Sequence, residues 1–500
     1  MTTPPTDLSA SAVAMTTTHA DKSGWVAAVD LGATSGRVMV GHVGPDTLEV
    51  EAVHRFPNEA VRTADGLHWN ILELYRQVLA GLQKAIEQHP EIVSVGVDSW
   101  AVDYGLFRGA RMIGGPVHYR DERTARGVEL VEKLVSPSEL YAAGGLQFLP
   151  FNTLYQLAVD QADGLLDGDT EMLMLPDLFA FWLTGEKAVE RTNASTTGLL
   201  DILRGQWNDG LIDKLGLPRT LFPPIVSSGE RIGQLSDQVR GELGATRRVE
   251  VVAVGSHDTA SAVVAVPMSS RAAAYISSGT WSLVGVELDA PVLSDASREA
   301  NFTNEGGVDG RIRYLRNVMG MWLLSESVKS WQRSGQTIEL TELLAEAAAL
   351  PGPVTTFDTE DPSLMPPGDM PSRIAALCAG GSEGGGPAPA TPAEFARSIV
   401  ESLAAAYAST LADAGRLSGV KIDTVHIVGG GSQNALLCQL TADRTGLPVL
   451  AGPVEATAIG NVLVQARAAG FVSGSLEDLR ELVARTHQPM RYEPAAAGGS

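Results

Sequence analysis

The amino-acid sequence predicts an α/β fold with mixed sheets, and three observations carry that prediction. Strand-like apolar runs alternate with helical spacing along the chain, as in α/β proteins. Two β-hairpins, at residues 25–43 and 272–287, require antiparallel strand pairs beside any parallel ones. Both hairpins consist of an apolar strand, a turn of small residues with glycine and a second apolar strand, so the sequence also predicts two related halves.

Each half is expected to hold its hairpin and a series of alternating elements. β-branched and apolar runs predict the strands, and apolar residues three or four apart predict the helices. In the first half the elements after the hairpin are a helix at residues 71–88, a buried strand at 92–97 that ends at Asp98, a helix at 173–184 that begins near Pro176, and a strand at 249–254 with a following helix. In the second half they are a long amphipathic helix at 395–417, a strand at 424–428 and a helix after a glycine turn.

Composition predicts how the chain divides. Residues 1–22 and 488–500 have the composition of flexible tails, and the run GGSEGGGPAPATP within residues 379–392 has that of a flexible loop. Between the tails we expect an N-terminal domain at residues 23–266 and a C-terminal domain at residues 267–487.

The charge balance excludes one class of function. The 500 residues carry 37 Lys and Arg against 59 Asp and Glu, which is a formal net charge of −22. Nucleic-acid binders normally present a basic surface, so the sequence argues against a nucleic-acid partner. An anion bound by so acidic a chain must be held locally, by backbone N–H groups, a few arginines or a metal ion.

Cysteine content and hydropathy bear on the compartment. Cys378 and Cys438 are too few for a disulfide framework, and no Cys/His cluster predicts a structural zinc site. No window of about 18 apolar residues predicts a membrane span, and residues 1–22 lack the basic start and apolar run of a signal peptide. We therefore expect a cytoplasmic protein without a membrane partner.

The first hairpin turn, DLGATSGR at residues 30–37, has the character of a phosphate-binding loop. Glycines let the backbone turn tightly, and successive N–H groups with the Thr34 and Ser35 hydroxyls can cradle phosphate oxygens. Arg37 can add a charge-assisted contact, and Asp30 can hold a hydrated Mg²⁺ beside the phosphates. An ordinary glycine-containing hairpin explains the same residues about as well.

Two further turns of small residues share this character. SSGT at residues 277–280 forms the tip of the second hairpin, and two facing tips can clamp a polyphosphate from both sides. GGG at residues 429–431 lies between a strand and a helix, where glycine lets a flat nucleotide approach the backbone and the helix N-terminus favours anions. Alone, each is more simply a tight turn, and neither the dinucleotide pattern nor the Walker A pattern is present.

The run His257-Asp258-Thr259 follows a buried strand and precedes a helix. A carboxylate there can accept the proton of a substrate hydroxyl as that hydroxyl attacks phosphorus. The helix N-terminus would keep Asp258 ionised, as a base requires. The simpler alternative is that Asp258 caps the helix.

Polar and aromatic residues gather after the strand at residues 92–97. DSWAVD at residues 98–103 joins polar groups to an aromatic ring, and RDER at residues 120–123 and the pair Asn152-Thr153 add further hydrogen-bonding groups. Sugars are bound by such mixtures of planar hydrogen-bonding groups and an apolar face. A solvated surface position is the simpler explanation for each charged residue taken alone.

With these motifs in order, the chain resembles the FGGY carbohydrate kinases from about residue 25 to the region of residue 486. Single blocks are weak evidence, whereas their number and order are specific, and among family members the set is most similar to those that act on L-rhamnulose. The matching blocks are VAAVDLGATSGRVMV, VGVDSWAVDYGL, YRDERT, GLQFLPFNTLYQL, NASTTGLLD, VGSHDTASAV, YISSGTWSLVG, NFTNEGG, RNVMGMWLL, HIVGGGSQN and AGPVEATAIGN.

The resemblance implies a fold, an activity and a set of site residues. The fold is two ribonuclease-H-like (actin-like ATPase) domains with ATP in the cleft between them. The activity is transfer of the γ-phosphate of ATP, with Mg²⁺, to the 1-hydroxyl of L-rhamnulose, with Asp258 as the proton acceptor. By carry-over, the nucleotide contacts are Ala33, Thr34, Ser35, Gly36, Arg37, Thr280, Ser325 and Gly430, and the sugar contacts are Ala101, His257, Asp258, Thr259 and Asn317.

Two positions depart from the family pattern. Ala101 stands where the family usually has Gly, and its methyl group can trim the sugar pocket or shift the backbone. Ser325 stands where the family often has a Gln that contacts the nucleotide, so the shorter side chain loses that contact or makes it through water. Neither change removes a catalytic group.

The sequence leaves two alternatives open and predicts no oligomeric state. One is an FGGY kinase for another substrate, such as L-fuculose, D-xylulose, L-ribulose, glycerol or an aldonate, which the phosphate motifs do not distinguish. The other is an actin-fold ATPase that binds proteins or forms filaments. That protein would share the phosphate turns but would not need the HDT, DSWAVD and NFTNEGG blocks.

Overall fold

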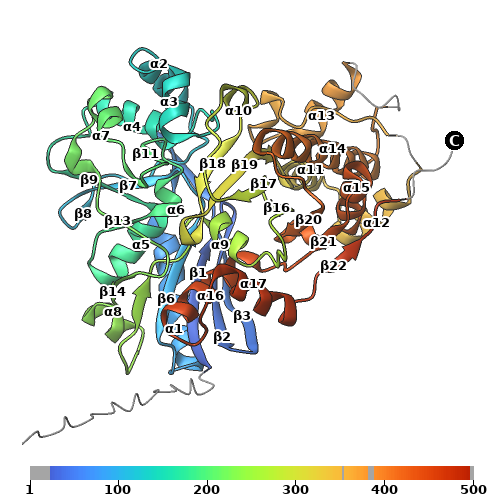
Figure 1. Cartoon of the computed structure of the whole chain (residues 1–500). Coiled ribbons are helices and arrows are strands. Elements are labelled where there is room, and N and C mark those ends of the chain that lie inside the picture. Colours follow the sequence, from blue (N-terminus) through green and yellow to red (C-terminus); the bar gives the residue numbers. More distant parts are fainter. Residues whose placement is uncertain (1–22, 352–353, 381–387, 496–500) are drawn as a thin grey trace, which may run out of the picture.

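The computed structural model describes residues 23–351, 354–380 and 388–495. Two large sheets dominate it, one built from the first half of the chain and one from the second (Figure 1). The predicted tail at residues 1–22 lies outside the described residues, as does the part of the predicted loop at residues 381–387. Among the described residues, no helix is both long and apolar enough to cross a membrane.

The first sheet has six strands in the order β14-β15-β6-β1-β2-β3 and is mixed, as predicted. β1 pairs with β2 as the expected antiparallel hairpin and with β6 in parallel. β6 runs through Ser99 rather than ending at Asp98, because the parallel register continues to the pair Leu31 and Ser99. The strands are β1 Gly24–Leu31, β2 Ser35–Gly44, β3 Thr47–Pro57, β6 Ser94–Ser99, β14 Arg231–Gln234 and β15 Glu250–Val252.

The second sheet has seven strands in the order β18-β19-β17-β16-β20-β21-β22. The predicted second hairpin is its β16–β17 pair, and β16 pairs with β20 in parallel. β22 falls in the predicted tail after residue 487, but it pairs with β21 and so covers an edge strand that would otherwise be unpaired. The strands are β16 Ala273–Ser278, β17 Trp281–Leu288, β18 Thr303–Gly306, β19 Ile312–Met319, β20 Thr424–Val428, β21 Val449–Ala451 and β22 Met490–Tyr492.

Helices cover the sheets with apolar faces. α1 Ile71–Gln88 matches the predicted helix and buries Ile71, Leu74, Val78 and Leu82 on one side, at the spacing of an amphipathic helix. α5 Leu175–Thr184 begins next to Pro176, as predicted, and Leu173 and Met174 of the helical run instead end strand β9.

The longest helix, α14 Pro392–Ser418, extends beyond the predicted residues 395–417 at both ends. Thr391 and Glu394 form a capping box at its start, and Pro392 occupies the first turn. Gly419, with φ of 78°, ends the helix in the left-handed conformation.

A pair of helices joins the two halves. α16 Ala456–Ala468 comes late in the sequence but packs against strands β1, β2 and β6 of the first sheet, as Figure 1 shows in red against blue. It also packs on α9 Asp258–Val264. The contact is so close that a Cβ atom on Gly460 would lie 1.8 Å from the Ser261 carbonyl oxygen. Glycine is therefore required at this crossing.

The remaining elements surround these layers. In the first half they are β4 Ala60–Thr63, β5 Gly66–Trp69, β7 Tyr104–Arg108, β8 Arg111–Met112, α2 Thr124–Glu132, α3 Pro137–Gly144, α4 Thr153–Ala162, β9 Thr170–Met174, β10 Val189–Glu190, α6 Arg191–Ala194, β11 Leu200–Asp201, β12 Gln206–Trp207, α7 Asp209–Lys214, β13 Ile225–Val226 and α8 Asp237–Glu242. In the second half they are α10 Asp295–Glu299, α11 Trp322–Arg333, α12 Leu340–Ala349, α13 Met370–Ala379, α15 Ala435–Thr445 and α17 Leu476–Thr486.

Candidate active site

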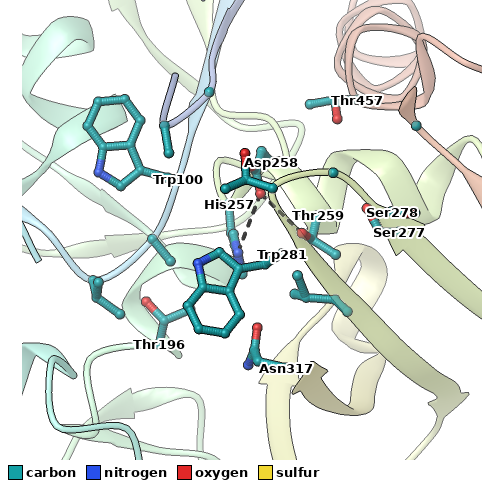
Figure 2. Close-up of a pocket in the computed structure, with 18 of the residues that line it drawn as sticks. Trp100, Thr196, His257, Asp258, Thr259, Ser277, Ser278, Trp281, Asn317 and Thr457 are labelled. Atoms are coloured by element: carbon teal, nitrogen blue, oxygen red, sulfur yellow. Dashed lines mark hydrogen bonds and ion pairs between the residues drawn. The ribbon is translucent and has the colours of Figure 1, made fainter. Parts of the chain in front are cut away.

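A cavity of about 460 Å³ draws its walls from both halves of the chain. Both hairpin turns line it, together with residues 257–259 and the glycine turn after β20. In Figure 2, Asp258 lies near the centre of the view, with Trp100 to its left, Trp281 and Asn317 below it, and Ser277 and Ser278 to its right. The motifs that the sequence singled out separately therefore meet at one place.

The first hairpin turn is closed by its own backbone. The Gly32 N–H donates to the Ser35 carbonyl oxygen at 2.9 Å. Asn58, which is buried, braces the turn from β3's end: its side chain donates to the Gly32 carbonyl at 2.9 Å and its N–H to the Thr34 carbonyl at 3.0 Å. The turn is thus held in shape before any ligand arrives.

The second hairpin turn and the glycine turn form one unit. β16 and β20 run in parallel with Ser277 opposite Val428, so both strands end at the same edge of the sheet. Gly429 has a φ of 79°, and a Cβ atom there would lie 3.0 Å from the Ser278 carbonyl oxygen. A Cβ atom on Gly431 would lie 2.0 Å from Ser278 Oγ. These glycines are needed because the two turns touch.

Charged residues link the two halves at the first hairpin. Arg37 Nε donates to Asp30 Oδ2 at 2.7 Å, and Arg37 also pairs with Glu455, which directly precedes α16. Arg55 Nη2 lies 2.9 Å from Glu455 Oε1. Burial would lower the pKa of Arg37, but the charges of Asp30 and Glu455 raise it overall. The sequence predicted that Arg37 contacts phosphate; in this structure its guanidinium group pairs with the carboxylates of Asp30 and Glu455.

Asp258 is the first residue of α9, and His257 holds the N-cap position. The helix-cap alternative for Asp258 therefore does not describe this turn. Its carboxylate accepts a hydrogen bond from Thr259 Oγ1 at 3.1 Å and lies 3.5 Å from His257 Nε2, as the dashed lines of Figure 2 show. Burial raises the pKa of Asp258; His257 lowers it and the charge of Asp30 raises it. A helix terminus alone does not set its charge.

His257 is held from behind by a buried ion pair. Its Nδ1 lies 3.2 Å from Glu305 Oε2, and Arg313 Nη2 lies 3.1 Å from the same oxygen. Arg313 is fully buried and also donates to the Gly306 carbonyl at 2.9 Å. Burial would raise the pKa of Glu305, but the charge of Arg313 and the hydrogen bonds of His257 and Asn317 lower it overall. Arg313 Nη2 also lies 3.0 Å from His257 Nδ1, so the Arg313–Glu305 pair together fixes the imidazole ring next to Asp258.

An aromatic wall adjoins Ala101. Trp100 lines the cavity, and its indole N–H donates to the buried Asp103 at 3.1 Å. Val102 has a φ of 68°, which is unusual for a β-branched residue, and Thr153 Oγ1 holds its carbonyl oxygen at 2.7 Å. Such strain costs on the order of 1–3 kcal/mol and persists where the surroundings over-determine the backbone. Ala101 and Val102 are thereby fixed as part of the cavity lining.

Comparison with known proteins identifies the family. The model for the FGGY family of carbohydrate kinases, N-terminal domain, matches residues 25–265, and that for the C-terminal domain matches residues 274–469. The chain belongs to the FGGY family of carbohydrate kinases. It is therefore a carbohydrate kinase, as the motifs predicted.

Curated relatives of this kinase match it over most of its length. A rhamnulokinase of Klebsiella pneumoniae (strain 342) is 43% identical over 88% of this chain and 88% of its own. One of Pectobacterium atrosepticum is 41% identical, with 94% and 93% covered, and one of Bacteroides thetaiotaomicron is 39% identical, with 93% and 95% covered.

Solved structures confirm the fold of the kinase. The xylulose kinase of Rhodospirillum rubrum has a TM-score of 0.74 at 17% identity, with 95% of each chain covered. The gluconate kinase of Lactobacillus acidophilus has a TM-score of 0.73 at 15% identity, with 95% of this chain and 94% of that chain covered. The fold is the two-domain actin-like ATPase fold that the sequence predicted.

Most of the predicted site residues of this kinase line the cavity, and three do not. Those that do are Asp30, Ala33, Thr34, Arg37, Ala101, His257, Asp258, Thr259, Thr280, Asn317 and Gly430. Ser35 is exposed beside the turn, and Gly36 is buried where a Cβ atom would meet the Phe56 ring at 2.3 Å. Ser325 lies on an exposed position of α11, outside the cavity lining, so its side chain makes no wall of the site.

Several residues of the site were not singled out from the sequence. Gln147, Trp281, Glu305 and Glu455 all line the cavity. Each lies inside one of the family-like blocks, so the blocks themselves were the available signal. What the sequence does not show is which member of a block turns inward.

The carboxylates at the ends of β1 and β6 fit a divalent cation. Asp30 and Asp98 are paired in the parallel register, and Asp98 Oδ1 is buried without a hydrogen-bond partner among the described residues. Burial, followed by the charge of Asp30, raises the pKa of Asp98 well above its usual value, against a hydrogen bond from Asn461. A bound cation would relieve the repulsion between the Asp30 and Asp98 carboxylates. No cluster of three or more metal-binding side chains occurs in the described part of the chain, and Mg²⁺ usually keeps several waters and uses only one or two carboxylates.

Proposed function

We propose that this kinase transfers the γ-phosphate of ATP to the 1-hydroxyl of L-rhamnulose, giving L-rhamnulose 1-phosphate and ADP in L-rhamnose catabolism. The observation that carries the proposal is the 39–43% identity to proteins named rhamnulokinase. That identity extends over 88–94% of the chain, so it includes the sugar-pocket blocks as well as the phosphate turns. The xylulose and gluconate kinases of known structure share only 17% and 15%.

The two hairpin turns are proposed to hold the polyphosphate of ATP. The contacts are assigned to Ala33, Thr34, Ser35, Gly36, Arg37, Thr280 and Gly430. Backbone N–H groups suit this task in an acidic protein, because they supply local positive potential without a basic surface. Arg37 would exchange a carboxylate partner for a phosphate oxygen when ATP binds.

The sugar is proposed to lie between Asp258 and the aromatic wall. Ala101, His257, Thr259 and Asn317 are assigned as its contacts. In the reaction the 1-hydroxyl oxygen attacks the γ-phosphorus, the bond from that phosphorus to the β,γ-bridging oxygen breaks, and the proton of the hydroxyl passes to Asp258. The bridging oxygen leaves with ADP.

The protein contributes mainly position and charge to this transfer. His257, held by the Arg313–Glu305 pair, keeps the Asp258 carboxylate oriented. Asp30, with Asp98 behind it, would hold the hydrated Mg²⁺, which when bound supplies positive charge to the phosphate oxygens. Closure of the two halves on the substrates would exclude water, which otherwise competes with the sugar as phosphate acceptor.

Replacing the proposed base tests the assignment. We expect Asp258→Asn to fold, to bind ATP and to lose between about a hundredfold and ten-thousandfold in kcat, because only proton acceptance is removed. Sugar-dependent ADP release measures the rate, and nucleotide titration measures ATP binding. Asp237→Asn, whose carboxylate is 94% exposed on α8, is the matched control and should keep full activity.

Two outcomes would reject the proposal. Near-normal turnover by Asp258→Asn would remove Asp258 as the base. ADP release stimulated by a polypeptide or by self-assembly, but not by any sugar, would favour the actin-fold ATPase alternative.

A further inference from the structure

A loop from the first half of the chain is held by the second half. Residues 145–152 join α3 to α4 and contribute Leu146, Gln147 and Phe151 to the cavity lining. The Gly145 carbonyl accepts hydrogen bonds from Asn304 through its N–H at 2.8 Å and its side chain at 3.0 Å. This loop therefore forms part of the sugar side of the cavity only while it is bound to the second sheet.

Gln147 pairs with the edge of that sheet as a strand residue would. Its Oε1 accepts from the Asn317 backbone N–H at 2.8 Å, and its Nε2 donates to the Asn317 carbonyl at 3.3 Å. β18 begins at Thr303, opposite Leu315, so continuing the register would place Asn301 opposite Asn317. Asn301 instead has a φ of 54° and turns away. The Gln147 amide fills the vacant pairing position, and its side chain is 5% exposed.

The same contact fixes the orientation of the Asn317 side chain. A backbone N–H can only donate, so the Gln147 atom that receives it is the carbonyl oxygen. That oxygen also lies 3.1 Å from Asn317 Nδ2, which must then be the amide nitrogen. Asn317 Oδ1 is left to face the cavity, and Figure 2 shows the oxygen directed toward the region of Trp281.

We propose that Gln147 is a positioning residue for the sugar: it turns the Asn317 amide so that Oδ1 accepts a hydrogen bond from a sugar hydroxyl. The inference rests on the proposed function, since it takes Asn317 as a sugar contact. It adds that the hydroxyl bound there acts as a donor. It also adds that Gln147, in the first half, orients Asn317, a sugar contact in the second half. Sugar binding therefore depends on the two halves being in contact.

Gln147→Met tests the proposal, because methionine keeps the length and volume of the side chain without its amide. We expect KM for the sugar to rise about tenfold, which is the loss of a hydrogen bond of ordinary strength, while KM for ATP changes less than about twofold. The sugar used is whichever ketose the wild-type enzyme phosphorylates best. Phe148→Ala, a neighbour whose side chain is 47% exposed and outside the cavity lining, is the matched control for the loop and should leave both KM values unchanged.

A double-variant comparison separates positioning from general loosening. If Gln147 acts through Asn317, adding Gln147→Met to Asn317→Ala raises the sugar KM no further than Asn317→Ala alone. The proposal is overturned if the effects of the two changes on the sugar KM multiply in the double variant. It is also overturned if Gln147→Met leaves the sugar KM unchanged, or raises the KM values for sugar and ATP equally. These results are distinct from failure of the proposed function, which would appear as a wild-type preference for a sugar other than L-rhamnulose.

Discussion

At the scale of single residues, the site places the half-buried Asp258 carboxylate near two buried carboxylates. Asp30, Asp98 and Asp258 influence one another, and the charge of Asp30 raises the pKa of both others. Arg37 is the cation that faces this group, and it is shared between Asp30 and Glu455. For a chain with a net charge of −22, the proposed contacts to a polyanion are Arg37, backbone N–H groups and a metal ion. If Arg37 contacts phosphate as proposed, ATP must compete with the Asp30 and Glu455 carboxylates for it.

Buried histidines give the stability of the protein a specific pH dependence. Burial, helped by the charge of Arg480, lowers the pKa of His426, which is 2% exposed on β20, from 6.5 to about 4. Between pH 6.5 and about 4 the unfolded chain binds a proton at this ring that the folded chain does not, so the ring costs stability as pH falls. At pH 8 the ring is neutral in both states and this term vanishes.

The stability that His426→Gln loses relative to wild type should therefore be smaller at acidic pH than at basic pH. The free energy of unfolding of the variant minus that of wild type should rise by on the order of 2 kcal/mol from pH 8 to pH 5. The reason is that the variant has no ring at this position for the unfolded chain to protonate. Urea unfolding at the two pH values measures this difference. An identical wild-type-to-variant difference at both values would show that His426 is not held neutral by the fold.

At the scale of elements, α16 is the helix that ties the halves together under the carboxylates. Asn461 Nδ2 donates to Asp98 Oδ2 at 2.5 Å, and Gln465 Nε2 donates to the Ala27 carbonyl at 2.9 Å. Ser94 Oγ donates to Gln465 Oε1 at 2.7 Å. All of these side chains are buried, so a polar ladder of the second half is built into the core of the first sheet. Such ladders are costly when one member is lost.

Asn461→Leu should destabilise the protein by about 2–4 kcal/mol, because it leaves the buried Asp98 carboxylate without its donor and puts a larger apolar group beside it. The urea midpoint and slope measure the effect. Ala468→Gln, at the exposed end of the same helix, is the control and should change the free energy by less than about 0.5 kcal/mol. A midpoint for Asn461→Leu equal to that of wild type would contradict the role given to the ladder.

Elements with a local signal were predictable, and elements that depend on distant partners were not. The two hairpins and α1 follow from apolar periodicity and glycine turns, which act within a few residues. β22 is three residues long and forms only because β21 offers an open edge, so nothing in its own composition distinguishes it from a tail. The packing of α16 on the first sheet was likewise not predicted, because the small residues of the helix do not indicate which element they pack against.

The candidate site divides in the same way. Asp258, His257 and Thr280 stand in short motifs whose residue types point to phosphate and proton chemistry, and all three line the cavity. Gln147 and Glu305 act through contacts with residues more than a hundred positions away or on another element, and a sequence shows no such contact. Ser325 was carried over from the family pattern, and it lies outside the cavity lining.

At the scale of the whole molecule, the active site exists only between the halves. One hairpin turn comes from each half, and the cavity wall joins Trp100 and Gln147 of the first half to Trp281 and Asn317 of the second. The domain boundary between residues 266 and 267 stays a prediction; α9 ends just before it and β16 begins just after it. Because both halves line the cavity, opening of the halves would separate its walls and with them both proposed substrate sites.

The central claim is the identity of the sugar, and a substrate panel tests it most directly. Initial rates of ADP release with ATP and Mg²⁺ are measured over L-rhamnulose, L-fuculose, D-xylulose, L-ribulose and glycerol, and compared as kcat/KM. The account predicts the highest kcat/KM for L-rhamnulose, with phosphate on its 1-hydroxyl, and loss of that activity in Asp258→Asn. A clear preference for D-xylulose or glycerol would contradict it.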